Sequence, residues 1–502
     1  MISIPVLSLL IWQPIAFAIL LLSRRSATHQ SNDRLAMLSA MITLVANSYL
    51  IVVFDPLIPD LQFVEVIRWL PMLNSDYRLA CDGLALMLIS LSSVITLAVL
   101  VTSKALVDHQ QSAYCAIFLI LQGLMNGLFC SQDALLFFVF FEAMLIPMYL
   151  CIGIWGSTNR SYAATKFFLY TFIGSIFLLI AILFLGLKAH SFSLAHLAKL
   201  PLTLHEQTVI MLMFWIAFAV KIPMFPLHTW LPDAHTEAPA GGSMILAALL
   251  LKVGSFGIYR FIIPITPDAM YAYWHVIVTL SIISITYIGF VALVQQDIKR
   301  LIAYSSVAHM GFVTLGSVLI FPISLQYHHN AEWINMAIEG SMIQMIAHGF
   351  SSAALFLAFG YIYNQVHERD IDHYGGLCTV TPVLSACFML FCLSNIGLPG
   401  TAGFVGEFMV IISSAQANPL ITLFAASTLI LSASYTLWMY RRVFYGKPSQ
   451  LVSNLKDVEG SFKVTLIVLA LSIVIMGCYP RLITTYLQHT SHPLVAHALR
   501  SR

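Results

Sequence analysis

Six side chains that can take up and release protons lie inside otherwise apolar stretches of this 502-residue sequence. They are two carboxylates, two lysines and two histidines: Glu142, Glu407, Lys221, Lys252, His309 and His348. A charge at the depth of a lipid bilayer costs about 2.5 to 3.5 kcal/mol even on the lenient insertion scale, so such residues are retained for pairing or for ion transport. Because histidine titrates near neutral pH and can both accept and donate a proton, the set is typical of a proton pathway.

The first interruption expected in the chain lies at Lys221. This lysine follows an uncharged run of 13 residues, 208–220, and is itself followed closely by Pro223 and Pro226. Proline removes a backbone donor and clashes with the preceding turn, so we expect a membrane helix that breaks at Lys221. Lys252 stands in the next uncharged run, and we expect it near the middle of the helix formed there.

The two carboxylates occupy similar settings. Glu142 lies in LLFFVFFEAMLIPMYL, shortly before Pro147, and Glu407 lies in SNIGLPGTAGFVGEFMVII. A second broken helix is expected beside Glu407, because that segment contains Gly397, Pro399, Gly400 and Gly403. Of the 22 aspartates and glutamates, only Glu142 and Glu407 are expected well inside membrane spans.

The composition indicates a polytopic membrane protein. The chain is 59% hydrophobic and 9% charged, with a mean hydropathy of +0.88, a balance that no soluble domain keeps. A net charge of +2 without a dense basic block argues against a nucleic-acid partner. The eight cysteines occur singly, without a CxxC pair, so they indicate neither an iron–sulfur cluster nor a disulfide framework.

Runs of about 20 apolar residues have the length needed to cross a bilayer as helix, and we expect 14 of them. The first run begins at Met1, with no basic residue before it and no small-residue cleavage site. This run is therefore interpreted as a retained span and not as a signal peptide. The expected spans are 1–22, 35–54, 84–103, 112–130, 134–155, 162–187, 208–230, 241–263, 271–294, 300–321, 333–363, 380–414, 420–440 and 463–485.

The distribution of basic residues predicts an orientation. Loops after odd-numbered spans hold 14 of the 24 lysines and arginines and the opposite side holds 8, the other two being Lys221 and Lys252. Since basic residues accumulate on the cytoplasmic side, we expect the odd loops in the cytoplasm and both chain termini outside it.

The two expected breaks predict an internal repeat. The fold is expected to be all-α, with an N-terminal three-helix segment (1–111), two five-helix units (112–264 and 265–445), and a C-terminal span and tail (446–502). The broken helix is the fourth member of each unit. Because five is odd, the second unit enters the membrane from the opposite face, which is the inverted-repeat architecture of many transporters.

Each candidate also has a structural interpretation. A buried glutamate and lysine can be a static pair that fixes helix packing, and a lone histidine on an apolar helix is often a packing residue. Four residues after the first break could suggest a metal site, but their spacing fits no familiar ligand set: His228, Asp233, His235 and Glu237.

Three motifs resemble those of the antiporter-like membrane subunits of respiratory complex I, the NADH-quinone oxidoreductase. They are KIPMFPLHTWLPDAHTEAPAGGSMILAALLLKVGSFGIYRF at 221–261, QQDIKRLIAYSSVAHMGF at 295–312 and NIGLPGTAGFVGEF at 395–408. The resemblance covers essentially the whole chain. It extends to the related Mrp-type sodium/proton antiporters. In those antiporters and in the sister antiporter-like subunits of complex I the position of Glu407 is typically lysine, so the glutamate favours one particular subunit type of complex I.

The resemblance also implies roles for the buried groups. Glu142 and Lys221 would form a carboxylate–lysine pair, and Lys252 would connect it to the rest of the pathway. His309 and His348 would be relay positions, with Glu407 the terminal protonatable group.

The function expected on this basis is proton translocation without redox chemistry in this chain. Flavin, iron–sulfur clusters and quinone are expected on partner subunits, which include sister antiporter-like subunits, and the location is expected to be the bacterial inner membrane. The chain carries no cofactor motif of its own, such as GxGxxG after a strand or a Walker lysine loop. Two alternatives stay open: a cation/proton antiporter subunit, and a structural membrane spacer whose charges fix subunit docking.

Overall fold

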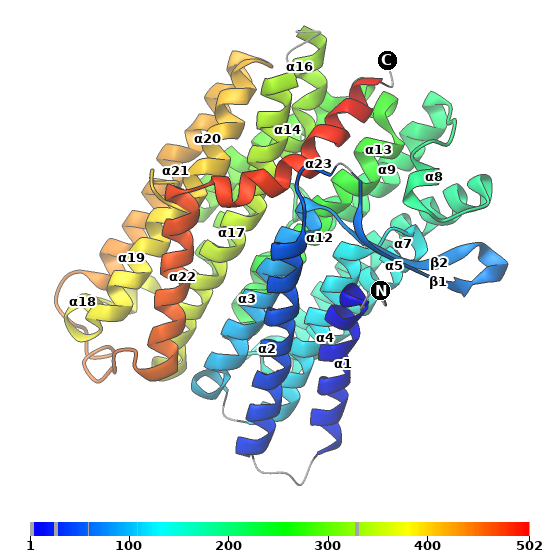
Figure 1. Ribbon diagram of the computed structural model, residues 1–502. Coiled ribbons are helices and arrows are strands. Elements are labelled where there is room, and N and C mark those ends of the chain that lie inside the picture. The colour runs from blue at the N-terminus through cyan, green and yellow to red at the C-terminus, as the bar shows by residue number, and fades with distance from the viewer. Residues whose placement is uncertain (1–4, 25–28, 59, 108, 327–330, 501–502) are drawn as a thin grey trace.

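Long apolar helices lying side by side make up most of the structure, a computed structural model that describes residues 5–24, 29–58, 60–107, 109–326 and 331–500 (Figure 1). Within these residues, 13 helices are long and apolar enough to cross a membrane. Two shorter apolar helices fill the region expected as the twelfth span. The all-α membrane fold is therefore confirmed, while the count of 14 spans, the unit boundaries and the inverted repeat stay predictions.

The helices follow the predicted spans closely, with boundaries that differ by a few residues. The first four residues of the first expected span lie outside the described residues. So do two of the basic residues counted for the expected orientation, Arg25 and Arg502. The long helices are α1 Val6–Ser23, α2 His29–Val53, α3 Gly83–Leu106, α4 Gln111–Cys130, α5 Ala134–Ala143, α6 Leu145–Trp155, α7 Arg160–Ala189, α9 Leu204–Lys221, α14 Pro267–Leu293, α15 Ile298–Val318, α17 Ala331–Val366, α19 Pro382–Ile396, α20 Ala402–Ala415, α21 Pro419–Phe444, α22 Gly460–Cys478 and α23 Arg481–Arg500.

Shorter elements connect or interrupt these helices. The eighth span is built from α11 Ala240–Ile245, the π-helical η2 Leu246–Leu250, α12 Leu251–Gly257, the π-helical η3 Ile258–Ile262 and α13 Ile263–Ile265. The others are η1 Pro71–Leu73, α8 Leu194–Leu197, α10 Trp230–Glu237, α16 Ile320–Gln326, η4 Ile371–His373 and α18 Leu377–Val380. We call the face at which α1 ends and α2 begins the lower face, and the face that carries α16 and α23 the upper face (Figure 1).

Side-chain caps fix where several membrane helices begin. Asp82, Asp133 and Asp297 accept hydrogen bonds from first-turn backbone N–H groups of α3, α5 and α15. Thr203 and Glu206 form a reciprocal capping box at the start of α9. These caps satisfy backbone donors that have no partner within the helix, at points where each chain segment re-enters an apolar environment.

Both predicted breaks are present. Helix α9 ends at Lys221, and the chain turns through 222–229 before α10 begins. The second break separates α19 from α20 at 397–401, where Gly397 closes α19 in the left-handed conformation with φ of +80°. A third interruption follows Glu142: α5 ends at Ala143, because Pro147 has no N–H to donate to the Ala143 carbonyl.

The centre of the bundle is formed by α15, α17 and the eighth span, which other helices surround. Close packing joins the eighth span to α9, because Gly254 and Gly257 face it without side chains. A Cβ on Gly254 would lie 2.7 Å from the carbonyl oxygen of Phe218, and one on Gly257 would lie 2.3 Å from the Phe218 ring. The three central elements carry Lys252, His309 and His348, so the fold places these residues where lipid does not reach.

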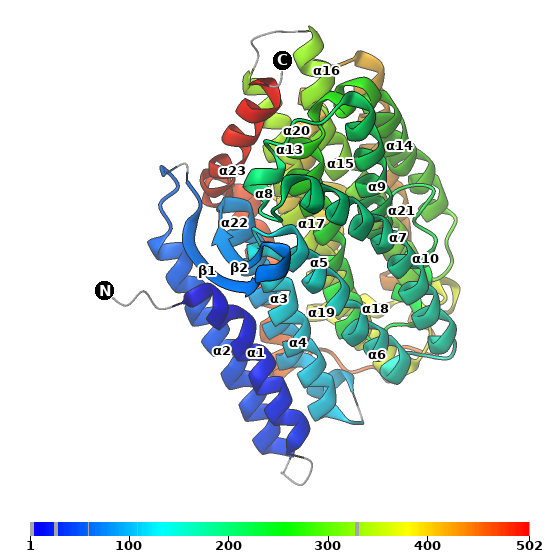
Figure 2. The same ribbon diagram turned by 90° about the vertical axis from the view of Figure 1, so that its right-hand side faces the viewer.

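Two elements were not predicted. Strands β1 Gln62–Leu70 and β2 Ser75–Cys81 form an antiparallel hairpin between α2 and α3, and α23 is a helix where a tail was expected. Figures 1 and 2 show the hairpin projecting from the bundle and α23 lying across its upper face. Helix α23 packs on α3, α13 and α17, and Thr490 on it donates to a carboxylate oxygen of Asp82 at 2.8 Å.

The carboxylate of Asp82 contacts three segments, η3, α3 and α23. It forms an ion pair with Arg260 on η3 at 2.6 Å, caps α3 through the Ala85 N–H, and accepts from Thr490 on α23. Burial acts to raise the pKa of Asp82, but the Arg260 guanidinium and these hydrogen bonds outweigh it and hold the pKa below its ordinary value. Asp82 is therefore a charged anchor for α23.

Candidate functional site

Lys252 and His348 meet at the centre of the bundle. The Lys252 ammonium donates to the Ala247 carbonyl at 2.6 Å and lies 2.7 Å from Nδ1 of His348. Ala247 belongs to the π-helical turn η2, and π-helical turns of this kind are frequent at functional sites. Lys252 and His348 are 0% and 3% exposed, so the predicted mid-helix lysine is fully removed from solvent.

His309 and Glu407 form the next contact. Nδ1 of His309 lies 2.6 Å from a carboxylate oxygen of Glu407, and each residue is 2% exposed. The rings of His309 and His348 are 5.8 Å apart between centroids. Lys252, His348, His309 and Glu407 therefore form a file of two contacting pairs on four helices, α12, α17, α15 and α20, with a gap between the two imidazole rings.

Glu407 is further held by Gln344 on α17, whose amide donates to the same carboxylate oxygen at 2.8 Å. The other oxygen faces the broken backbone, where a Cβ built on Gly397 would lie 3.2 Å from it. That oxygen has no hydrogen-bond partner among the described residues, and neither has Nε2 of His309 or of His348. Buried atoms of this kind are places where water or a moving proton is accommodated.

Lys221 lies at the end of α9 with its ammonium surrounded by aromatic rings. Its Nζ is 4.8 Å from the centroid of Phe141 and 5.8 Å from that of Phe167. It has no hydrogen-bond partner among the residues that the structure describes. Ring faces attract a cation, and the last turn of a helix favours one as well, so this lysine is stabilised without a bonded carboxylate.

Glu142 lies within electrostatic range of Lys221 but makes no direct ion pair with it. One of its carboxylate oxygens is buried and has no partner in the described part of the chain. The two members of the predicted pair are therefore neighbours in a separated state. Within that same part of the chain, no hydrogen bond or ion pair joins them to the file that begins at Lys252.

An ion-pair network holds the residues that follow the first break. Asp233 pairs with Lys166 at 2.6 Å and with Arg300 at 2.9 Å. Glu237 accepts from Ser157 at 2.6 Å and lies 3.4 Å from Arg369. These contacts give both carboxylates a structural role at the lower end of α10. Among the described residues, no group of three or more His, Cys, Asp or Glu side chains is arranged to hold a metal ion.

Two buried charged residues were not expected inside the membrane helices. Lys299 was expected in a loop, but it lies in the first turn of α15 and is 2% exposed. Glu339 lies inside α17 and is 6% exposed, where it accepts from Ser491 of α23 at 3.1 Å. The expectation that only Glu142 and Glu407 lie inside spans was therefore wrong. Glu339 falls within the expected eleventh span, 333–363.

Comparisons with known proteins show which sequences and folds this chain is similar to. The family model described as "NADH:quinone oxidoreductase/Mrp antiporter, TM" matches residues 131–432. The NADH-quinone oxidoreductase subunit M of Rhodobacter capsulatus is 40% identical over 514 residues, covering 99% of this chain and 96% of that protein. The NADH-ubiquinone oxidoreductase chain 4 of Arabidopsis thaliana is 39% identical over 495 residues, covering 98% and 97%.

Solved structures show the same fold. A chain of respiratory complex I from Thermus thermophilus superposes with a TM-score of 0.87 at 29% identity, covering 98% of this chain and 99% of that one. A chain of the Mrp complex from Dietzia sp. DQ12-45-1b superposes with a TM-score of 0.86 at 19% identity, covering 99% and 100%. At that identity the second match concerns the fold alone.

Proposed function

Because the chain belongs to the NADH:quinone oxidoreductase/Mrp antiporter family of membrane subunits, we propose that it translocates protons as a membrane subunit of an NADH:quinone oxidoreductase. Its partners are the other membrane subunits of that complex, among them sister antiporter-like subunits. The electron-carrying groups, flavin, iron–sulfur clusters and quinone, belong to partner subunits. The bacterial inner membrane is the proposed location, with both termini on the periplasmic side.

One observation carries the proposal: the file Lys252, His348, His309 and Glu407 inside the bundle. Consecutive contacts of 2.7 Å and 2.6 Å are hydrogen-bond distances, and the remaining step is between two imidazole rings 5.8 Å apart. An imidazole accepts a proton on one nitrogen and releases it from the other. A proton that enters at Lys252 can therefore reach Glu407 by short steps.

In this proposal, the pair Glu142 and Lys221 drives the movement of protons along the file. When the carboxylate approaches Lys221, it stabilises the ammonium; when it withdraws, the low-dielectric surroundings favour the neutral amine, and the proton moves on. In the structure the pair makes no direct hydrogen bond, so it is free to come into contact in the other state of the proposed cycle. Quinone reduction in partner subunits would supply the energy that alternates the two states.

Replacing Lys221 or Glu142 by alanine in the assembled complex tests this function. Proton translocation into membrane vesicles is measured together with NADH oxidation, and we expect both variants to lose coupled translocation. Lys188→Ala is the matched control, because Lys188 is a partly exposed lysine in the last turn of α7 that pairs with Glu206, 2.5 Å away. Full coupled translocation in both the Lys221 and the Glu142 variants would overturn the assignment.

The Mrp-type alternative has weaker support. The likeness to the Mrp complex is one of fold at 19% identity, and Glu407 stands where that type typically has lysine. Cation-driven proton flux in the absence of NADH would favour it, whereas flux that depends on NADH oxidation favours the complex I function.

A further inference from the structure

An open cavity of about 550 Å³ lies between the lower halves of α2 and α3, beside the first turn of α22. Arg34 of α2, Lys104 of α3 and Ser461 of α22 line its lower end. Helix α3 packs against α2 and against α22 (Figure 1). Helices from the two ends of the sequence therefore meet around one cavity.

The charged side chains that line this cavity leave a surplus positive charge. They are two cations, Arg34 and Lys104, and one carboxylate, Asp33, which gives a net charge of +1. Lys104 pairs with Asp33 at 2.9 Å. Arg34 is exposed and forms no hydrogen bond or ion pair within the part of the chain that the structure describes. The Arg34 guanidinium is therefore available to an anionic group in the cavity.

The first turn of α22 adds hydrogen-bond donors to the same end of the cavity. Glu459 precedes this helix without capping it through its side chain, and the backbone N–H of Ser461 has no partner among the described residues. Free N–H groups at a helix N-terminus favour phosphate oxygens, and so does a neighbouring guanidinium. The donors that a phosphate group needs are therefore present on three separate helices.

Two apolar surfaces lead from this end toward the middle of the bundle. One belongs to the same cavity and consists of Met37, Leu38 and Met41 on α2. The other is a groove of about 390 Å³ between α3 and α22, which shares Val101 and Ser461 with the cavity. The walls of the groove include the apolar residues Val94, Leu97, Val464, Val468 and Leu469. The space is therefore branched, with one polar end and two apolar arms.

The depth of the groove matches one leaflet of a bilayer. Lys104 at its polar end and Val94 at its far end are ten residues apart on α3, which is about 15 Å of helix. The hydrocarbon core of a bilayer is about 30 Å thick, so the groove reaches about halfway across it. A two-chain lipid of the lower leaflet has this depth and this division into a polar and an apolar part.

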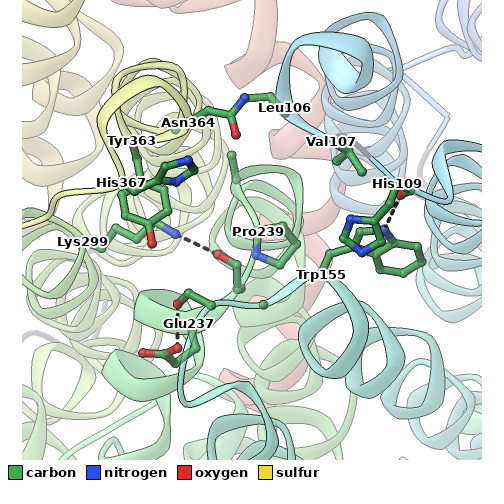
Figure 3. A pocket seen from close by; sticks show the side chains of 15 residues that line it. Leu106, Val107, His109, Trp155, Glu237, Pro239, Lys299, Tyr363, Asn364 and His367 are labelled. Atoms are coloured by element: carbon green, nitrogen blue, oxygen red, sulfur yellow. Dashed lines mark hydrogen bonds between the residues drawn. The ribbon is translucent and has the colours of Figure 1, made fainter.

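A smaller cavity at the lower face lacks the surplus charge. Its volume is about 220 Å³, and its charged lining residues, Glu237 and Lys299, carry one charge of each sign (Figure 3). The Lys299 ammonium already donates to the Ala238 carbonyl at 2.8 Å. A cavity whose lining charges cancel does not favour an anion, so the charge pattern distinguishes the space between α2, α3 and α22.

We propose that the space between α2, α3 and α22 binds one anionic phospholipid of the lower leaflet. The phosphate group contacts Arg34, Lys104 and the first turn of α22. One acyl chain lies along α2, and the other lies in the groove between α3 and α22. A phosphodiester carries one negative charge, which matches the net charge of +1 on the lining. In the orientation proposed above the lower face is cytoplasmic, where anionic lipids attract basic residues.

Photo-cross-linking in the assembled complex tests this site. The complex is placed in phosphatidylcholine nanodiscs that contain a small fraction of phosphatidylglycerol with a diazirine in one acyl chain. After irradiation, the labelled peptides are identified by mass spectrometry. We expect labels on the groove walls of α3 and α22. An excess of unlabelled phosphatidylglycerol should remove these labels, whereas additional phosphatidylcholine should not.

Substitutions in the lining test each part of the site. Arg34→Gln and Lys104→Gln should each lower labelling of the groove about fivefold, the scale of one basic residue near an anionic surface. Lys104→Arg should retain the labelling, because the charge is kept. Val468→Trp fills the groove without changing its charge and should stop labelling at Leu97. Lys447→Gln is the matched control, because Lys447 is exposed in the lower-face loop between α21 and α22 and lines neither the cavity nor the groove.

Three results would overturn the site. The first is equal labelling by a phosphatidylcholine probe that carries the same diazirine chain, which contradicts selection of an anionic lipid. The second is unchanged labelling in both Arg34→Gln and Lys104→Gln, which contradicts the phosphate contacts. The third is the absence of label on α3 and α22 in the assembled complex, which means that a partner subunit covers the groove. Proton translocation is a separate readout, so none of these results decides the function proposed above.

Discussion

Nδ1 of His309 lies 2.6 Å from a carboxylate oxygen of Glu407, and both side chains are almost completely buried. The two residues are 98 positions apart in the sequence and come from different helices, α15 and α20. Gln344 holds the same oxygen from α17. The contact therefore joins Glu407, the last residue of the file, to His309 next to the broken helix. The residues of the file can be tested separately.

Glu407→Gln should abolish most proton translocation while leaving the complex assembled. The amide keeps the size of the side chain and can still accept from Gln344, but it does not take up a proton. We expect a loss of about 100-fold, the scale of removing a proton-transfer group. Glu407→Asp keeps the carboxyl group and should retain part of the activity. Translocation by Glu407→Gln at the parent rate, measured in vesicles, would contradict a proton-transfer role.

Lys252→Arg should keep the buried positive charge but lose proton translocation. A guanidinium stays protonated at any physiological pH, so it can contact His348 but cannot release a proton. Lys252→Met removes the charge and leaves the Ala247 carbonyl without its side-chain donor. Both variants should fail in proton translocation measured against NADH oxidation. Recovery of translocation with arginine would mean that charge alone is needed at this position.

Gly397→Ala should impair translocation more than Gly400→Ala does. Both glycines have positive φ, +80° and +90°, so both substitutions strain the backbone by about 1 to 2 kcal/mol. A methyl group on Gly397 would also press on the free carboxylate oxygen of Glu407 at 3.2 Å, whereas one on Gly400 meets nothing within 4 Å. Equal activity of the two variants at equal expression would show that the contact with Glu407 is unimportant.

Asp82→Asn should loosen α23 at neutral pH by leaving Arg260 as an unpaired buried charge, at a cost of about 3 to 5 kcal/mol. In the parent protein the folded state lowers the pKa of Asp82. The stabilisation is then fully present above the unfolded pKa of about 3.9 and is lost as pH falls through the lower folded value. Protection factors of the α23 backbone amides, which correct for the intrinsic pH dependence of hydrogen exchange, should be flat from pH 8 to about pH 5 and fall only in stronger acid. A loss of protection beginning near pH 6 would implicate another group.

The sequence was sufficient to predict the helical class, the two breaks and the burial of five of the six titratable groups, whereas Glu142 is only half-buried. Apolar run length and the position of Pro223 or Gly397 are local signals, and local signals determine where a helix ends. The contact between His309 and Glu407 depends on how α15, α17 and α20 pack, and no spacing within one helix encodes it. Whether the predicted carboxylate–lysine pair is in contact depends on side-chain geometry, which the sequence does not contain.

The burial of Lys299 and Glu339 was missed for a different reason, and His235 was considered only as a possible metal ligand. Each stands near the end of an apolar run, where a charged or polar side chain ordinarily faces water. Neighbouring segments cover them in the fold: α23 covers Glu339, and α17 covers His235 through Phe356. The position of Glu339 in EGSMIQMIAH, inside the expected span 333–363, was a signal that could have indicated a buried carboxylate.

The absence of a side chain on Gly254 gives α9 and the eighth span a direct backbone contact at Phe218, and Gly257 packs on the ring of the same residue. No compressible layer of side chains separates the two helices at that point. If α9 shifts to bring Lys221 toward Glu142, the segment that carries Lys252 has to shift with it. The two halves of the pathway lack a bonded connection, yet they are mechanically linked, so the charge state of one can alter the geometry of the other.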